Sequence, residues 1–272
     1  MKNLFLFLFS ISVFISCNKE NNDPKNPLKE ELTLSKIVEN APNKAAWVSR
    51  EQMKSRNGDS MGYGVILNPN SKKLVLFLDG GGACFNPLTC FQNLDRYSEV
   101  DFLDRMASHS SLLINRESDQ NQFKDWNLVF VPYATGDVHS GTNSAVNVPN
   151  DGPKNQNMVG FNNFTLVLKD LKNYFDANGN ITEIVFMGSC ACGYGVLSKT
   201  SQFADILAKN IPTTVIMDAS PVFMDKTLLS PCLADIWSSD SLWNTNSTLP
   251  IDLDETIQNN YNHNLQKLYE YL

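Results

Sequence analysis

The fold is decided by the stretch Ile184-Val-Phe-Met-Gly-Ser-Cys-Ala-Cys-Gly-Tyr-Gly195. It begins with a short apolar run that stops at Gly188 and leads, through small residues, into a helix-like pattern over residues 194–208. A short apolar run bounded by glycine is typical of a strand buried on both faces. A strand, a sharp turn and a helix in this order can present a nucleophilic side chain at the tip of the turn.

The crowding of such a turn decides which residue lies at its tip. Small residues are needed two positions to either side, and around Cys190 these are Gly188 and Cys192. Around Ser189, one of them would be Met187, which is too large. Cys190 is therefore the predicted nucleophile, and the adjoining helix N-terminus favours its thiolate. A second interpretation stays open, in which both cysteines only fill a tight turn.

Apolar runs and helical patterns alternate along the rest of the chain. Strands are predicted at residues 63–67, 74–78, 126–131, 184–187 and 213–217, and helices at 161–175, 194–208 and 254–271. This alternation predicts an α/β fold, with a mostly parallel sheet and flanking helices. Functional sites in such sheets lie at the carboxyl ends of the strands, which directs attention to the segments after Leu78, Val131, Met187 and Met217.

The amino end predicts an exported lipoprotein. Residues 4–15 form an apolar run that suits a signal peptide and is too short to span a bilayer. Ser16-Cys17 ends this run and resembles the lipobox of bacterial lipoproteins. We therefore expect a signal peptide over residues 1–17 with lipidation at Cys17. The alternative is an ordinary signal peptide that is cleaved nearby. Residues 18–31 read as a flexible tether before a domain over 32–272. The expected location is the bacterial cell envelope, with the membrane contacted only through the lipid.

Composition narrows the function further. The chain of 272 residues has a net charge of -7, which argues against nucleic acid as a partner. Hydrophobic residues make up 42%, too many for a disordered chain. No dinucleotide fingerprint or phosphate loop occurs, so no cofactor is expected. Two thiols at Cys190 and Cys192 without a neighbouring His form an incomplete metal site, so no metal is expected.

A glycine run follows the predicted strand 74–78. In Asp79-Gly-Gly-Gly-Ala-Cys84, glycines let the backbone turn sharply and direct N–H groups at a ligand, although a plain glycine-rich turn would look the same. Cys84 and Cys90 follow closely, and in an exported protein they are expected to form a disulfide loop; two buried thiols are the alternative.

Together these segments resemble the pectin acetylesterase/Notum family of α/β-hydrolase-fold carboxylesterases. The matching stretches, in the family's order, are Gly58-Asp-Ser-Met-Gly-Tyr63, Leu76 to Cys84 with Cys90, Trp126 to Gly141, Gly188 to Gly195, and Met217-Asp-Ala-Ser-Pro221. The resemblance implies an α/β-hydrolase-like sheet and cleavage of a small-molecule or carbohydrate acyl ester. It also implies an oxyanion hole formed by backbone N–H groups of Gly81, Gly82, Ala83 and Ala191.

Two departures from the family pattern bear on activity. Cys190 replaces the family's serine, and Cys192 replaces a glycine. The family's acid and His follow the nucleophile on late strand-end loops, but residues 191–272 contain one convincing strand, whose last residue, Asp218, precedes the acid's position. The predicted domain is therefore C-terminally incomplete.

No histidine is predicted to act as the base. His139 belongs to the family's loop motif and is expected to bond local backbone, while His263 lies on a predicted surface helix and His109 has no such position. The sequence thus predicts a hydrolase of carboxylic esters by resemblance, without its triad acid and base. The alternative is an inactive ligand-binding lipoprotein, or a truncated remnant of a longer esterase.

Overall fold

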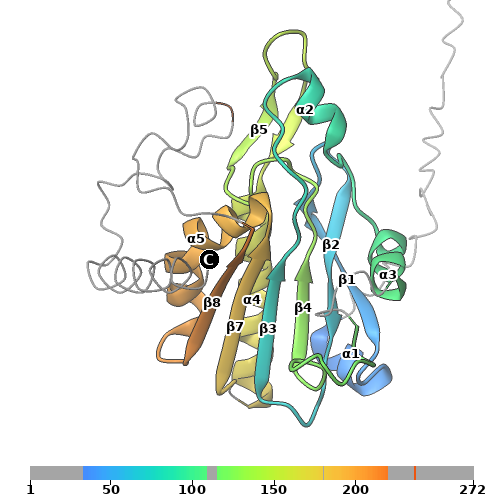
Figure 1. Cartoon of the computed structure of the whole chain (residues 1–272), viewed down its shortest axis with the longest axis vertical. Coiled ribbons are helices and arrows are strands. Elements are labelled where there is room, and N and C mark those ends of the chain that lie inside the picture. The colour runs from blue at the N-terminus through green and yellow to red at the C-terminus, as the bar shows by residue number, and fades with distance from the viewer. Residues whose placement is uncertain (1–32, 109–114, 180, 220–235, 237–272) are drawn as a thin grey trace, which may run out of the picture. The chain divides into compact units, whose positions relative to one another are not determined.

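A six-stranded sheet forms the centre of the described chain (Figure 1). The computed structural model describes residues 33–108, 115–179, 181–219 and Ile236. The sheet has the order β1-β2-β4-β3-β7-β8. Its strands are β1 Ala45–Lys54, β2 Ser60–Ile66, β4 Asn127–Val131, β3 Lys73–Leu78, β7 Glu183–Ser189 and β8 Thr213–Asp218.

The sheet confirms the predicted α/β class. Each of the five predicted strands overlaps an observed one, and β4, β3, β7 and β8 run parallel. β2 pairs antiparallel with β4, and β1 pairs antiparallel with β2. The sequence did not predict β1, because its polar and exposed residues interrupt the apolar alternation that marks a strand.

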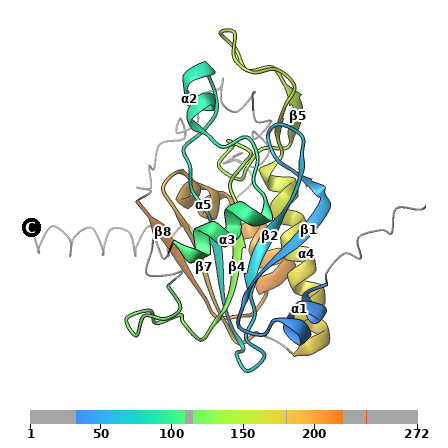
Figure 2. The same ribbon diagram turned by 90° about the vertical axis from the view of Figure 1, so that its right-hand side faces the viewer.

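Helices cover both faces of the sheet (Figure 2). On one face, Phe164 of α4 (Gly160–Asn178) stacks on Phe186 of β7, as does Phe203 of α5 (Ala191–Phe203). On the other face, Phe102 of α3 (Glu99–Ala107) packs against Phe130 of β4. A short helix, α1 (Leu34–Asn40), contacts α4. A five-residue π-helix, η1 (Ala204–Ala208), continues α5 to the residue where the predicted helix ends.

Two segments of the chain extend beyond the carboxyl ends of the parallel strands (Figure 1). One carries the short helix α2 (Pro87–Gln92). The other is a two-stranded hairpin of β5 (Asn143–Val146) and β6 (Gln156–Met158). Both lie at the edge of the sheet where sites form in α/β proteins.

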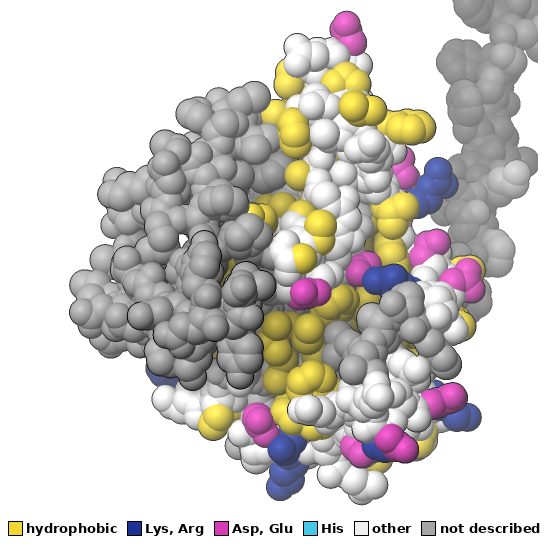
Figure 3. Space-filling model, viewed as in Figure 1, with side chains coloured by type: hydrophobic (Ala, Val, Ile, Leu, Met, Phe, Trp, Pro, Cys, Tyr) yellow, Lys and Arg dark blue, Asp and Glu magenta, His cyan; other side chains and the backbone are white. Residues whose placement is uncertain are grey.

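The outer strand β8 differs from the central strands in its exposure. All its residues are exposed or half-buried, and Val215 is 42% exposed, whereas β3 is buried over Leu74–Leu78. Figure 3, drawn in the view of Figure 1, shows the face of the molecule turned toward the viewer. Hydrophobic side chains reach the surface there, and charged side chains lie at the margins of that apolar area. Among the described strands, β8 pairs with β7 alone.

Several predictions concern residues outside the described ranges. These are the signal peptide and Cys17, the tether 18–31, His109, His263 and the helix over 254–271. In the part of the chain that is described, no helix has the length and apolar character required to cross a membrane.

Candidate active site

Cys190 is the single residue between β7 and α5. Its backbone has φ 55° and ψ −133°, a left-handed conformation that costs a residue with a side chain about 1–3 kcal/mol. Its N–H donates to the Asp218 carbonyl at 2.9 Å, and its own carbonyl accepts from the Gly193 N–H at 3.1 Å. These bonds hold the turn on both sides, and the Cys190 side chain is exposed at its tip.

The neighbours of Cys190 are packed as tightly as the sequence indicates. A Cβ at Gly188 would lie 2.5 Å from the Cys192 carbonyl oxygen, so no larger residue fits there. The Cys192 side chain is fully buried, and burial raises the pKa of its thiol well above the ordinary value. Cys192 is therefore a neutral packing residue, and Cys190 is the cysteine that solvent reaches.

The glycine run after β3 lies directly against this turn. A Cβ at Gly80 would lie 2.6 Å from the Ser189 carbonyl oxygen and 3.3 Å from the Cys190 Cβ. Asp79 fixes the start of the run, because its carboxylate accepts the Gly80 N–H and lies 3.5 Å from the Arg105 guanidinium. Burial raises the pKa of Asp79 despite these partners.

The backbone N–H groups that the family resemblance assigns to an oxyanion hole are open to a ligand. Within the described residues, the N–H groups of Gly81, Gly82 and Ala83 donate no hydrogen bond to the chain. Ala191 is the first residue of α5, which has no side-chain cap, and the first N–H groups of a helix lack intrahelical partners. Ala83 and Ala191 also pack against one hydrophobic cluster. The two segments thus lie close to the turn at Cys190.

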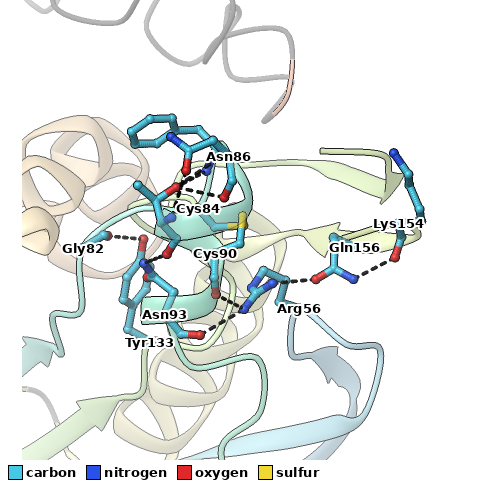
Figure 4. Close-up of a disulfide and its surroundings, with 11 residues drawn as sticks. Arg56, Gly82, Cys84, Asn86, Cys90, Asn93, Tyr133, Lys154 and Gln156 are labelled. Atoms are coloured by element: carbon cyan, nitrogen blue, oxygen red, sulfur yellow. Dashed lines mark hydrogen bonds between the residues drawn. A yellow bond between two sulfur atoms is a disulfide. The ribbon is translucent and has the colours of Figure 1, made fainter. Parts of the chain in front are cut away.

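The predicted disulfide between Cys84 and Cys90 is confirmed (Figure 4). It closes the segment between the glycine run and α2. The Cys84 N–H donates to the Gly136 carbonyl at 2.7 Å, and Arg56 donates to the Cys90 and Asn93 carbonyls at 2.9 and 3.0 Å. The disulfide therefore anchors the glycine run from its far end.

The loop after β4 supports the glycine run through Tyr133. The Tyr133 hydroxyl donates to the Gly82 carbonyl at 2.8 Å (Figure 4). It also accepts the Val138 N–H at 2.8 Å. Burial holds the pKa of Tyr133 well above 10, so the phenol keeps its proton and donates. The Tyr133 hydroxyl thus connects the glycine run to the loop after β4 through two hydrogen bonds.

His139 is a structural residue of the same loop. Its ring is buried, stacks near Tyr133 and places Nε2 3.1 Å from the Asp79 carbonyl oxygen. A carbonyl only accepts, so Nε2 carries the proton. Burial lowers the pKa of His139 to about 4, which keeps the ring neutral. The sequence favoured a bond to local backbone, whereas the structure places Nε2 against the backbone of Asp79, a residue distant in the chain, so Nε2 is not available as a base.

Sequence reasoning did not single out Asp137 and Lys199. The buried Asp137 carboxylate accepts the Thr135 hydroxyl at 2.6 Å and the N–H groups of Gly160 and Gly141 at 2.7 and 3.2 Å. Lys199 is fully buried on α5 and interacts electrostatically with Asp137. The sequence signal for Asp137 was its place in Gly136-Asp-Val-His-Ser-Gly141, while Lys199 gave none.

A groove of about 540 Å³ lies between α2 and the β5–β6 hairpin. Its lining includes Arg56, Phe91, Leu94, Asp151 and Gln156. Leu88, Phe91 and Leu94 are 65%, 87% and 59% exposed. This end of the molecule therefore offers an apolar surface near the carboxyl edge of the sheet.

Cys190 is expected to react faster with iodoacetamide than Cys192 in the folded protein. The reason is physical access together with charge state, because Cys192 is buried and its thiol stays protonated. Timed alkylation followed by peptide mass spectrometry measures the two rates, with urea-unfolded protein as the control in which the rates converge. Equal rates in the folded state would contradict the placement of the two side chains.

No group of three or more His, Cys, Asp or Glu side chains that could hold a metal ion is found among the described residues.

Comparison with known proteins places this geometry in a family. The chain is 24% identical over 163 residues to palmitoleoyl-protein carboxylesterase notum2 of Xenopus laevis, covering 58% of this chain and 32% of that protein. It is 29% identical over 150 residues to the NOTUM carboxylesterase of Schmidtea mediterranea, covering 53% and 27%. The chain thus spans about a third of the length of these relatives.

The fold comparison agrees. The solved structure of the Wnt deacylase Notum from Drosophila superposes with a TM-score of 0.51 at 19% identity, over 73% of this chain and 61% of that one. The family model described as Pectinacetylesterase matches residues 60–267, which include the glycine run, the loop after β4 and the turn at Cys190. The chain therefore belongs to the pectinacetylesterase family and shares the α/β fold of the Notum structure.

Proposed function

We propose that this protein hydrolyses carboxylic esters with Cys190 as the nucleophile. The observation that carries the proposal is the conformation of Cys190, which is held in a left-handed geometry with its side chain exposed. Strain of this kind persists where the surrounding structure enforces it, and it concentrates at active sites. The N–H groups beside the turn add the second element that acyl transfer needs.

The proposed reaction follows the chemistry of acyl transfer. The Cys190 thiolate attacks the ester carbonyl carbon, and the carbonyl oxygen becomes an oxyanion that accepts hydrogen bonds from the backbone at residues 81–83 and at Ala191. Collapse of this intermediate breaks the bond to the alkoxy oxygen, which takes a proton and leaves as an alcohol. Water then attacks the thioester, releases the acid and restores the thiol.

The proposed substrate is a small-molecule or carbohydrate acyl ester. The printed names of the relatives state palmitoleoyl-protein carboxylesterase and Wnt deacylase activities for those proteins. The shared family and the apolar surface of α2 support an ester whose acyl group is at least partly apolar. The amino-terminal pattern at Ser16-Cys17 supports a lipid anchor in the bacterial envelope as the place of action.

A second candidate function is ligand binding without turnover. The observation that favours it is the position of His139, the one histidine in the described ranges, which directs Nε2 at the Asp79 carbonyl. Loss of the base in a catalytic triad typically costs several orders of magnitude in rate. A site with an oxyanion hole and no base would hold an ester and leave it intact.

Trapping of an acyl-enzyme separates the two functions. Incubation with p-nitrophenyl acetate is expected to release p-nitrophenol and to add one acetyl group to the peptide that contains Cys190. The acetyl group should be removed by neutral hydroxylamine, which cleaves thioesters. Saturable binding of the ester, with neither p-nitrophenol nor acetylation above that of the unfolded protein, would instead support binding without turnover.

A further inference from the structure

Lys199 is a buried cation that the proposed reaction does not use. The side chain is fully buried on α5, and within the described residues its Nζ makes no hydrogen bond. Nζ lies 4.2 Å from the centre of the Phe161 ring, at the start of α4. Burying an ammonium without a hydrogen-bond partner is costly, so its place in the fold calls for a compensating role.

Asp137 is the carboxylate whose charge acts on Lys199. Burial lowers the pKa of Lys199 to about 7, and the Asp137 carboxylate opposes this shift. In turn, the Lys199 charge favours the ionised form of Asp137, whose pKa burial raises. An ionised Asp137 can accept the N–H groups of Gly160 and Gly141 together with the Thr135 hydroxyl. The two side chains therefore stabilise each other's charge inside the protein.

The loop that contains Asp137 is strained. Val138 and His139 have φ values of 50° and 58°, and a β-branched residue such as valine rarely adopts this left-handed conformation. Two consecutive residues of this kind persist only where neighbouring groups hold them. The hydrogen bonds to Asp137 are among the groups that do so, since they join the loop to the first turn of α4.

The loop that contains Val138 and His139 packs against α5, the helix that begins directly after Cys190. The Val138 carbonyl packs so closely on Gly195 that a Cβ there would lie 2.6 Å from its oxygen. The hydroxyls of Ser140 and Ser198 are 2.8 Å apart and share a hydrogen bond. Lys199 lies four residues after Gly195, about one turn further along α5, so both residues are on the side of the helix that the loop contacts.

We infer that Lys199 is a positioning residue for the site at Cys190. Its charge adds to the Thr135 and Gly160 hydrogen bonds that favour the ionised Asp137 and hold the loop in its strained form, and the loop places His139 Nε2 3.1 Å from the Asp79 carbonyl oxygen. Asp79 begins the glycine run that lies against Cys190. Lys199 thus sets the distance between the turn and the N–H groups that would stabilise an oxyanion.

The test removes the charge of Lys199 and keeps a side chain of similar volume. Lys199→Met is expected to lower kcat for p-nitrophenyl acetate by about 10- to 100-fold with little change in KM, because small displacements of reacting groups cost this much. It is also expected to change the alkylation rate of Cys190 by iodoacetamide. Both are measured well below the thermal midpoint of the variant. The matched control is Lys172→Met, which removes an exposed lysine paired with Asp176 on α4 and should leave both rates unchanged.

This inference rests on the proposed function for the kcat measurement only. If wild-type protein cleaves no ester, the proposed function fails, while the alkylation rate still reports the geometry of the turn. If Lys199→Met does not fold, Phe161→Leu keeps an apolar side chain, removes the ring face from Nζ, and should change the same rates in the same direction by a smaller factor. A folded Lys199→Met, or Phe161→Leu in its place, with wild-type rates of both hydrolysis and alkylation would overturn the inference.

Discussion

Replacement of Cys190 by alanine is expected to lower kcat/KM for p-nitrophenyl acetate by at least about a thousandfold. The substitution removes the proposed nucleophile and leaves the N–H groups at residues 81–83 in place. Steady-state hydrolysis rates at neutral pH measure the effect. Cys192→Ala is the matched control, because it also removes a thiol, but one that is buried two residues away. Wild-type rates for Cys190→Ala would exclude Cys190 as the nucleophile.

Cys190→Ser extends the same experiment to the missing base. A serine hydroxyl needs a general base before it attacks, whereas a few per cent of an ordinary thiol is already ionised at neutral pH. His139 cannot supply that base, since its Nε2 faces the Asp79 carbonyl. We therefore expect Cys190→Ser to be as slow as Cys190→Ala. A serine variant as fast as the wild type would mean that a working base reaches this turn.

The turn at Cys190 could be predicted from the sequence because its steric requirements are local. A turn between a strand and a helix leaves no room beside its tip, and the small residues Gly188 and Cys192, two positions to either side of Cys190, indicate where that tip lies. The disulfide between Cys84 and Cys90 was also predicted, from their separation of six residues together with the export that the amino-terminal pattern predicts. The helix after the turn begins at Ala191, three residues before the apolar pattern does, because glycine and cysteine carry no helical periodicity.

The roles of Asp137 and Lys199 could not be predicted from the sequence, because they depend on contacts between segments that are distant in the chain. Asp137 and Lys199 are separated in the chain by β5, β6, α4 and β7, and a lysine in a helix is ordinarily a solvated residue. The antiparallel pairing of β1 was missed for a related reason. An outer strand is partly exposed, and its polar residues at Ser49 and Glu51 remove the apolar pattern. The sequence thus predicts the turn at Cys190, and the structure shows the buried side chains and the strand pairing around it.

The stability of the protein is expected to depend on His139 as the pH falls. The ordinary pKa of histidine is 6.5, and burial lowers the pKa of His139 in the folded protein to about 4. Between these two pH values, the unfolded chain binds a proton at His139 and the folded protein does not, so acid favours unfolding. A shift of this size corresponds to about 3 kcal/mol of unfolding free energy, lost progressively as the pH falls from above 6.5 to 4.

His139→Gln isolates this contribution, because glutamine can still donate a hydrogen bond to the Asp79 carbonyl and does not titrate. At pH 7 the variant should be less stable than the wild type, since the ring also packs on Tyr133. Urea unfolding at pH 7 and at pH 4 should show the difference in unfolding free energy moving by about 3 kcal/mol in favour of the variant. The buried carboxyls of Asp79 and Asp137 and the Lys199 amine face this region in both proteins, so their own titration largely cancels in the difference. A difference that stays constant between the two pH values would mean that His139 can be protonated in the folded state, and a protonated ring would donate from both nitrogens beside the glycine run.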